Sequence, residues 1–196
     1  MSHSSIASPE PNVAFASEHR HEVQFYESTS FLSSAVARYF APGFRQGNAM
    51  VVIARPEHRT KFRTELAGQG FDLDAAINRG QFHEYDAEET LEKFVDGELP
   101  NRERFRAVIG QVIDECRNGR RANLPVLAYG EMVDVLWRKD KCEAAIRLEQ
   151  LWNELADSRP FELFCAYALN GFYKEAHRLQ FEKICKTHSR VYPTEK

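Results

Sequence analysis

Short apolar stretches of strand length alternate along most of the chain with longer stretches whose apolar residues recur at helical spacing. Five of the short stretches predict β-strands, at residues 21–26, 49–54, 81–85, 124–129 and 161–167. The stretch at 49–54 is apolar without interruption, which is typical of a strand buried on both faces. Strands separated by helices favour a parallel sheet, because parallel neighbours need a crossover connection. The pattern therefore predicts one three-layer α/β domain, with a mostly parallel central sheet of about five or more strands and helices on both faces.

Turn and cap signals separate the helical stretches from the strands. The first helix follows Ser28, and Pro42 with Gly43 is expected to end it. Asp86, with Glu89 three residues later, predicts a capping box at the start of another helix. Further helical patterns follow Pro56 and Pro100. Two more helices are expected between the fourth and fifth strands, with apolar residues from Met132 to Trp137 and from Ala145 to Leu155, and a final helix carries Phe181 and Ile184.

Composition and charge narrow the class of protein. The 196 residues suit one domain, and a net charge of −3 disfavours a general nucleic-acid binder, which needs a cationic surface. The mean hydropathy of −0.52 and the lack of a long apolar run argue against a membrane span. Residues 1–18 contain no export signal, so we expect a flexible tail on a cytoplasmic protein. The four cysteines are expected to be reduced thiols: Cys116, Cys142, Cys165 and Cys185.

The carboxyl ends of the predicted strands are the expected ligand-binding region, because in open parallel sheets the loops there meet the N-termini of helices. Four of the five strands carry a tyrosine at this boundary, and aromatic walls with a few polar groups suit a small, partly apolar molecule. The alternative is that each tyrosine packs its ring and hydrates its hydroxyl without binding anything. The candidate residues at this edge are Tyr26, Glu27, Tyr85, Asp86, Tyr129, Glu131 and Tyr167.

The sequence contains no nucleotide-binding loop of the usual kinds. A phosphate-binding loop needs glycines whose N–H groups face the phosphates and a lysine that meets their charge, yet Gly-Lys never occurs as a dipeptide. The first strand leads instead to Glu27 and Ser28, where the carboxylate would repel a triphosphate. Gly68 and Gly70 lack the third glycine of a dinucleotide-binding motif. We therefore expect neither ATP nor NAD, and no other cofactor.

Metal binding finds little support in local spacing. His19 and His21 would share one face of a strand, and His83 lies on another predicted strand. Structural metal sites normally show tighter ligand spacing, and Arg20 places a cation between the first two histidines. We therefore expect no metal, and His21 has a second interpretation as a histidine that is satisfied at the end of a strand.

Nucleophilic catalysis also finds little support. The sequence has no G-x-S-x-G motif, and Cys165 lies in an apolar strand that should keep its thiol protonated and inert. Glu131 and Asp134 have the spacing of an acid/base pair on one helix face, but such pairs more often form a solvated face. No reaction is identified, and we expect that the protein is not an enzyme.

Several segments, in this order along the chain, resemble the MEDS domain, which is the methanogen/methylotroph DcmR-type sensory domain. The most specific are the first strand, from His21 to Glu27, and the segment Tyr129-Gly130-Glu131-Met132. The others are residues 43–52, Trp137, Arg147-Leu148-Glu149 with Leu151-Trp152, and Cys165-Ala166-Tyr167. The resemblance covers residues 19–175, which leaves a tail at 1–18 and a C-terminal helix and tail, expected to pack on the domain, at 176–196.

The resemblance implies a sensory module with a RecA/KaiC-like fold that has lost the phosphate-binding loop. Members of this family are thought to recognise small organic molecules such as hydrocarbon derivatives, and they are commonly joined to histidine kinase or DNA-binding output domains. Carried over onto this chain, the motifs mark as pocket candidates His21, Tyr26, Tyr129, Glu131 and Cys165-Ala166-Tyr167. Only about 23 residues follow Tyr173, which leaves no room for an output domain, so we expect the signal to pass to a partner such as a histidine kinase or transcription regulator.

The leading hypothesis is thus a stand-alone cytosolic sensor of a small organic ligand. A second hypothesis is a non-catalytic adaptor with a vestigial pocket that binds a kinase or regulator, and a distant third is an atypical nucleotide-dependent enzyme. We expect no direct contact with nucleic acid or membrane, and the exposed edges of such a sheet are compatible with a homodimer. The basic C-terminal helix either packs its apolar side on the sheet, which we favour, or docks a partner through Phe181 and Ile184.

Overall fold

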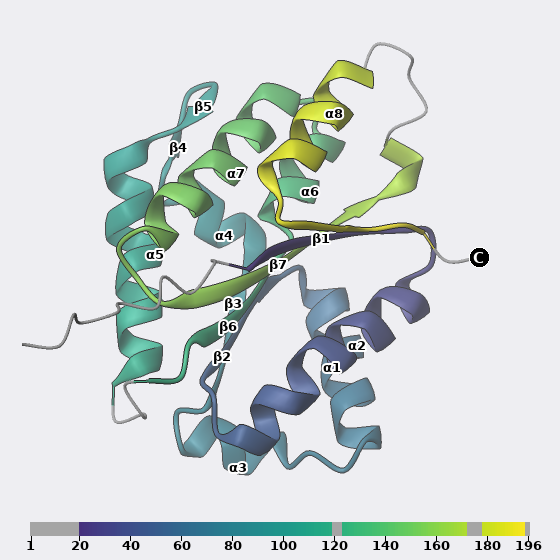
Figure 1. Ribbon diagram of the computed structural model, residues 1–196, viewed down its shortest axis with the longest axis vertical. Helices are drawn as coiled ribbons and strands as arrows, with labels where there is room; N and C mark the ends of the chain where they lie inside the picture. The colour runs from purple at the N-terminus through teal and green to yellow at the C-terminus, as the bar shows by residue number, and fades with distance from the viewer. Residues whose placement is uncertain (1–19, 119–122, 172–177, 195–196) are drawn as a thin grey trace, which may run out of the picture.

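The computed structural model describes residues 20–118, 123–171 and 178–194 (Figure 1). The strands in these ranges are β1 (His21–Tyr26), β2 (Met50–Ala54), β3 (Phe82–Asp86), β4 (Val95–Asp96), β5 (Leu99–Pro100), β6 (Val126–Gly130), β7 (Phe161–Ala168) and β8 (Arg190–Tyr192). The helices are α1 (Thr29–Gln46), α2 (Pro56–Gly68), α3 (Leu73–Asn78), α4 (Ala87–Glu92), α5 (Arg102–Arg117), α6 (Met132–Arg138), α7 (Cys142–Ala156), α8 (Arg178–Thr187) and the short 3-10 helix η1 (Leu169–Gly171). The tail expected at residues 1–18 lies outside the described residues.

Six parallel strands form the central sheet, in the order β3-β2-β6-β7-β1-β8, and β4 and β5 form a small separate antiparallel pair. Connections between parallel strands are right-handed, so the direction of each step across the sheet decides which face its helices cover. Steps toward β3 place α1, α2 and α3 on one face, and steps toward β8 place α4 to α8 on the other (Figure 1). The predicted three-layer α/β fold is confirmed.

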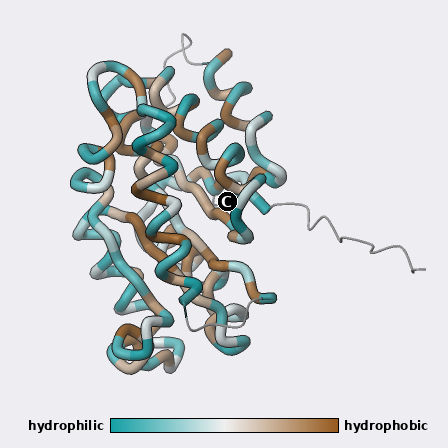
Figure 2. Tube along the Cα trace, turned by 90° about the vertical axis from the view of Figure 1, so that its left-hand side faces the viewer, coloured by the Kyte–Doolittle hydropathy of each residue, from teal (hydrophilic) through white to brown (hydrophobic). Residues whose placement is uncertain are grey.

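Two hydrophobic layers fill the spaces between the sheet and its helices. Because side chains alternate along a strand, Val52 of β2 packs toward α1 and α2 while Val51 and Ile53 pack toward the opposite helices. The first layer contains Phe40 from α1, and the second contains Trp152 from α7. In Figure 2 the apolar stretches, coloured brown, run through the middle of the molecule between helices whose outer turns are hydrophilic.

The expectation that Pro42 ends the first helix is wrong, because α1 continues to Gln46. A proline in the last turns removes a single backbone hydrogen bond, which does not by itself stop a helix that packs along the sheet. The stop comes at Gly47, whose φ of 85° is a left-handed conformation that glycine adopts without strain. The backbone N–H of Asn48 then donates to the carbonyl of Gly43 at 2.9 Å.

The C-terminal part of the chain joins the domain through both a helix and a strand. Ile184 of α8 is fully buried, and the ring of Phe181 lies 4.9 Å from that of Phe25 on β1. These apolar side chains therefore contact the domain itself. Strand β8, which the sequence pattern did not predict, pairs with β1 at the edge of the sheet. In the described part of the chain, no helix combines the length and the apolar character that crossing a membrane requires.

Candidate functional site

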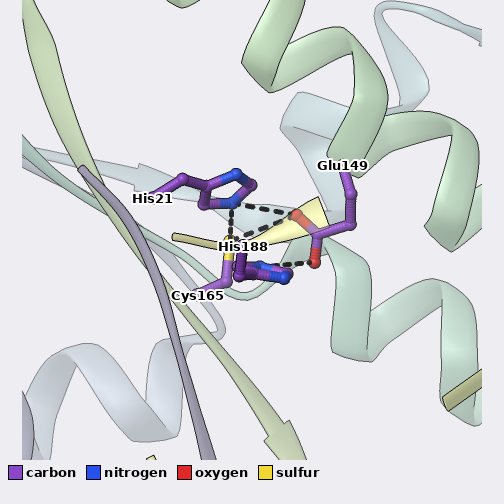
Figure 3. Close-up of side chains that lie close together, drawn as sticks. All are labelled: His21, Glu149, Cys165 and His188. Atoms are coloured by element: carbon purple, nitrogen blue, oxygen red, sulfur yellow. Dashed lines mark hydrogen bonds and ion pairs between the residues drawn. The ribbon is translucent and has the colours of Figure 1, made fainter. Parts of the chain in front are cut away.

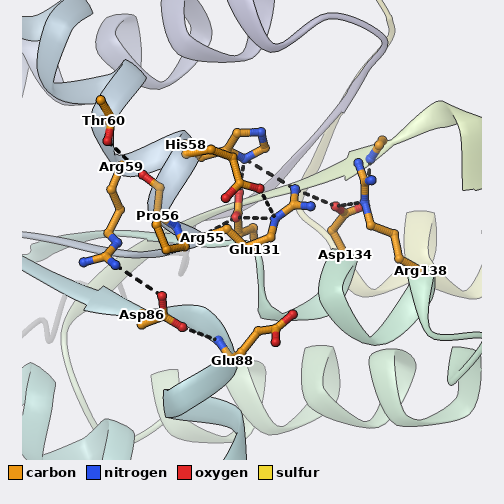
Figure 4. A network of polar contacts seen from close by, with 12 residues as sticks. Arg55, Pro56, His58, Arg59, Thr60, Asp86, Glu88, Glu131, Asp134 and Arg138 are labelled. Atoms are coloured by element: carbon orange, nitrogen blue, oxygen red, sulfur yellow. Dashed lines mark hydrogen bonds and ion pairs between the residues drawn. The ribbon is translucent and has the colours of Figure 1, made fainter.

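The carboxyl ends of β1, β2, β6 and β7 lie where the chain leaves the sheet toward opposite faces. After β1 and β2 the chain enters α1 and α2 on one face, and after β6 and β7 it enters α6 and η1 on the other side. Ligands bind at such switch points in open α/β sheets. Arg55 follows β2 and Glu131 follows the neighbouring strand β6, so the two side chains meet at this edge of the sheet (Figure 4).

Glu131 is the centre of a buried polar network. Its Oε1 accepts hydrogen bonds from the backbone N–H of Arg55 at 2.6 Å and from Arg55 Nε at 2.9 Å. Its Oε2 lies 2.5 Å from Nδ1 of His58 and accepts a bond from the Tyr129 hydroxyl at 3.1 Å. Burial by itself would raise the pKa of this carboxyl, but the contacts with His58 and Arg55 outweigh burial and lower it. Glu131 is therefore an ionised carboxylate inside the protein at neutral pH.

Arg55 connects this carboxylate to a second one, Asp134 (Figure 4). Asp134 Oδ2 accepts from Arg138 Nε at 2.7 Å and from Arg55 Nη2 at 3.3 Å. Its Oδ1 accepts from the backbone N–H of Ala168, the last residue of β7, at 2.9 Å. Burial raises the pKa of Asp134, and the nearby Arg138 opposes that rise without cancelling it. The positive charges of two guanidinium groups thus compensate the negative charges of two carboxylates at the edge of the sheet.

Tyr26, at the end of β1, is an incompletely satisfied member of this region. Its side chain is buried, and its hydroxyl has no hydrogen-bond partner among the described residues. Burial and the negative charges of Asp134 and Glu131 raise its pKa, so the hydroxyl keeps its proton and remains a donor. A buried hydroxyl without a partner costs about 1–3 kcal/mol. A polar atom that reached this hydroxyl would recover that free energy.

A second buried polar cluster lies on the α7 and α8 side of the sheet (Figure 3). The carboxylate of Glu149, on α7, accepts from the Tyr167 hydroxyl at 2.8 Å and lies 3.1 Å from His21 Nε2 and 3.4 Å from His188 Nε2. Cys165 Sγ lies 3.6 Å from the same carboxylate. Burial would raise the pKa of Glu149, but the two histidines lower it, whereas burial and then Glu149 raise the pKa of the Cys165 thiol.

A cavity of about 450 Å³ opens between α1 and the sheet, toward the amino ends of β6 and β7. Aromatic and aliphatic side chains form part of its wall: Tyr39, Pro42, Leu127, Phe164 and Tyr192. Charged and polar side chains form much of the rest, including the buried amides of Gln24 and Asn48. The Oδ1 atom of Asn48 is buried and has no hydrogen-bond partner among the described residues, while its Nδ2 donates to the carbonyl of Pro125 at 2.8 Å. The polar network around Glu131 lies at the carboxyl edge of the sheet, whereas this cavity lies toward the amino ends of β6 and β7.

The model of the MEthanogen/methylotroph, DcmR Sensory (MEDS) domain matches residues 20–189 of the chain. The chain belongs to the MEDS family. The MEDS domain is a sensory domain, so a role in signal transduction follows from membership. A solved structure of a protein from Pyrococcus horikoshii OT3 is similar with a TM-score of 0.52 at 9% identity, covering 89% of this chain and 81% of that one, which supports the fold alone. No match was found among curated proteins.

The residues predicted for ligand binding fall into four separate places in this MEDS domain. Tyr26, Tyr129 and Glu131 belong to the network at the carboxyl edge, with Glu27 exposed beside Tyr26. Asp86 caps α4 and is joined to Arg59 at 3.2 Å. The remaining candidates are His21, Cys165 and Tyr167, which surround Glu149, and Tyr85, which is half-buried on the α5 side.

The tyrosines do not form a common aromatic rim. Tyr26 and Tyr129 pack in the layer under α1 and α2, whereas Tyr85 and Tyr167 pack in the opposite layer. The reason is the alternation of side chains along each strand, which the position of a tyrosine near the strand end does not fix. Three of these four tyrosines are also almost completely buried, so the edge is polar and charged where it meets solvent.

Several important side chains were not among the predicted candidates. Arg55 directly follows a predicted strand, which is the same signal that marked its neighbours along the edge. His58 lies one turn into α2. Glu149 lies in a segment that resembles the MEDS family, but the resemblance assigned no role to this residue. His188, between α8 and β8, carries no local sequence signal. His83, which was weighed as a metal ligand, contacts the backbone carbonyl of Gly80 at 3.0 Å instead.

Proposed function

We propose that this MEDS domain binds a small, uncharged organic molecule at the carboxyl edge of the sheet and passes the resulting change to a partner protein. The observation that carries the proposal is the buried Tyr26 hydroxyl, which lacks a partner among the described residues, beside the bridge from Arg55 to Glu131 and Asp134. The charges of this network already balance, with Arg55 and Arg138 facing the two carboxylates. A neutral ligand with a hydrogen-bond acceptor therefore suits it better than an anion does.

The network also suggests how binding of a ligand at Arg55 could change the position of the end of β7. The side chains of Arg138 and Arg55 are 38% and 15% exposed, whereas those of Glu131 and Asp134 are 1% exposed. The two arginines are therefore the charged groups of the network that a ligand entering from solvent would meet. A ligand that engages Arg55 competes with its 3.3 Å contact to Asp134. Since Asp134 also holds the end of β7 through Ala168, that competition would alter the start of the segment leading to α8. We expect a partner such as a histidine kinase or transcription regulator to respond to this change.

A thermal-shift screen of small neutral organic molecules, combined with native mass spectrometry of the purified protein, tests the proposal. A ligand that prefers the folded state raises the melting temperature with its concentration. We expect the shift to be lost in Tyr26→Phe, which removes the hydroxyl and keeps the ring, and in Glu131→Gln. Tyr85→Phe is the matched control, because Tyr85 also lies near the carboxyl end of a strand but packs on the opposite face of the sheet.

A further variant distinguishes the edge from the cavity. Leu124→Trp fills space in the cavity beside α1, because Leu124 lines it and is only half-buried. Binding that survives Leu124→Trp and is lost in Tyr26→Phe supports the proposal. Binding that is lost only in Leu124→Trp moves the ligand to the cavity and overturns it. If no compound shifts the melting temperature and no molecule co-purifies, the adaptor hypothesis replaces it.

A further inference from the structure

Four side chains that are far apart in the sequence meet at one point inside the domain. His21 comes from β1, Cys165 from β7, Glu149 from α7, and His188 from the connection between α8 and β8 (Figure 3). All four are buried, and one ligand-type atom from each lies within 4.8 Å of the others. Along the chain these residues are separated by 128, 16 and 23 positions. A metal motif that can be recognised in a sequence has much closer spacing, so this cluster carries no such signal.

We propose that His21, Glu149, Cys165 and His188 form a buried binding site for one divalent transition-metal ion of the zinc type. Zinc is bound by cysteine sulfur, histidine nitrogen and carboxylate oxygen, and structural sites use four such ligands in a tetrahedral arrangement. The mixed set of two imidazoles, one thiol and one carboxylate contains each of these donor types. It lacks the many oxygen ligands that Ca²⁺ or Mg²⁺ prefers.

The distances between the four side chains agree with this geometry. With Zn–N and Zn–O lengths of about 2.0–2.1 Å and a Zn–S length of about 2.3 Å, neighbouring ligand atoms of a tetrahedron are about 3.3–3.6 Å apart. His21 Nε2 lies 3.1 Å from Glu149 Oε2 and 3.5 Å from Cys165 Sγ. Cys165 Sγ lies 3.6 Å from Glu149 Oε2, and His188 Nε2 lies 3.4 Å from Glu149 Oε1. All four ligand atoms lie within 4.8 Å of one another, and His188 faces the other oxygen of Glu149, so the His188 ring must move toward the other three side chains to complete the tetrahedron.

Both imidazoles are oriented by contacts on the far side of the ring. His188 Nδ1 lies 2.6 Å from the carbonyl of Ile184, which can only accept, so Nδ1 carries the proton. His21 Nδ1 lies 2.8 Å from Asn153 Oδ1, and Asn153 Nδ2 donates to the carbonyl of Thr187 at 2.9 Å, which fixes the direction of the amide. In the neutral rings both Nε2 lone pairs then face the cluster. Metal-binding histidines are usually held by such outer hydrogen bonds.

Charge and hydrogen bonding inside the cluster favour an ion at its centre. His188 Nε2 is fully buried and makes no hydrogen bond within the described part of the chain, although it lies 3.4 Å from Glu149. On binding, the Cys165 thiol gives up its proton to solvent, and its thiolate together with the Glu149 carboxylate neutralises the two positive charges of the ion. The ion would join β1, β7 and α7 to the connection that precedes β8, and so fasten the C-terminal part of the chain to the sheet.

The test uses the full chain and the metal alone. We expect the purified protein to contain close to one equivalent of zinc by elemental analysis, or to take up one equivalent after treatment with a chelator. Titration of the metal-free protein with Co²⁺ should produce a thiolate-to-cobalt charge-transfer band and the intense visible bands of a tetrahedral site. Zn²⁺ should raise the melting temperature of the chelator-treated protein by several degrees.

Matched variants show whether these four residues hold the ion. Cys165→Ser should abolish the charge-transfer band, and His188→Asn should weaken Co²⁺ binding at least tenfold, because asparagine keeps a donor for Ile184 and removes Nε2. Cys185→Ser and His83→Gln change the same residue types outside the cluster and should bind Co²⁺ as the parent protein does. The proposal is overturned if the parent protein gives no cobalt spectrum and no zinc-dependent stabilisation, or if binding persists unchanged in both cluster variants. The measurements on the parent protein decide the question even if a variant does not fold.

Discussion

The backbone N–H of Ala168, the last residue of β7, donates a hydrogen bond of 2.9 Å to Oδ1 of Asp134 in the first turn of α6. The other oxygen of the same carboxylate accepts from Arg138 and Arg55. Asp134 thus joins the end of a central strand to the charged network at the carboxyl edge. The side chain is 1% exposed, so its loss would leave buried partners without an acceptor.

Asp134→Ala should lower the free energy of unfolding by about 3–5 kcal/mol, which is typical when one partner of a buried ion pair is removed. Asp134→Asn should cost less, about 1–2 kcal/mol, because its amide oxygen still accepts from Ala168. Urea denaturation curves of the two variants measure both values. Asp114→Ala is the control, since Asp114 is 51% exposed and its contact with Arg159 should contribute less than about 1 kcal/mol. Equal losses at the two aspartates would contradict the structural role of Asp134.

Glu131 should make the stability of the domain depend on pH in the acid range. Its pKa in the folded state lies below the usual value of 4.5, because the contacts with His58 and Arg55 outweigh burial. The unfolded chain therefore binds more protons than the folded one as the pH falls past the usual value. The stabilisation from Glu131 is present above about pH 4.5 and is lost as the pH falls through the lower, folded-state pKa.

The measurement compares the parent protein with Glu131→Gln in urea titrations from about pH 6 to about pH 3. The gap in unfolding free energy between the two proteins should be largest at the upper end and should shrink toward the lower end. Asp134, whose pKa is raised, titrates in both proteins and does not create the difference. A gap that stays constant or widens in acid would show that the pKa of Glu131 is not lowered on folding.

Much of the fold could be predicted because its signals are local. The uninterrupted apolar run that contains β2 and the proline at the start of α2 each act within a few residues. The C-terminal part of the sheet carried no such signal, because β8 has three residues and pairs a charged one, Arg190, with Glu22. The end of α1 was misplaced because Gly47, and not Pro42, provides the left-handed stop.

The candidate sites could be predicted only in part. The rule for carboxyl ends of parallel strands predicted that Tyr26 and Glu131 lie at one edge, and the structure brings them near each other there, because the rule depends on topology that the strand pattern already contains. Their role in ligand binding stays a prediction. The rule does not predict which face of the sheet a side chain packs on, so it could not show that Tyr167 lies on the face opposite to Tyr26. His21 and His188 are 167 positions apart, and only the folded sheet brings their rings to a centroid distance of 4.0 Å.

Mg-ATP should not stabilise this domain. The turn after β1 contains Glu27 and Ser28, and the Ser28 hydroxyl accepts a hydrogen bond from the backbone N–H of Phe31 at 3.3 Å as the cap of α1. The turn thus offers a carboxylate where a phosphate-binding loop would offer glycine N–H groups and a lysine. Thermal-shift measurements with increasing Mg-ATP should give no change in melting temperature. A saturable increase that is lost in Glu131→Gln would instead favour the nucleotide-dependent hypothesis.

Two glycines that both lie in helices should respond oppositely to alanine. A Cβ atom at Gly43 in α1 would overlap Cδ1 of the buried Leu127, so the helix or the leucine must move. The gain in helix propensity offsets only part of this overlap, and we expect a net loss of about 1–2 kcal/mol. A Cβ atom at Gly68 in α2 meets nothing within 4 Å, and Gly68→Ala should stabilise the domain by about 0.4–1 kcal/mol. Urea midpoints of the two variants measure these effects, and a stabilising Gly43→Ala would show that α1 does not approach the sheet this closely.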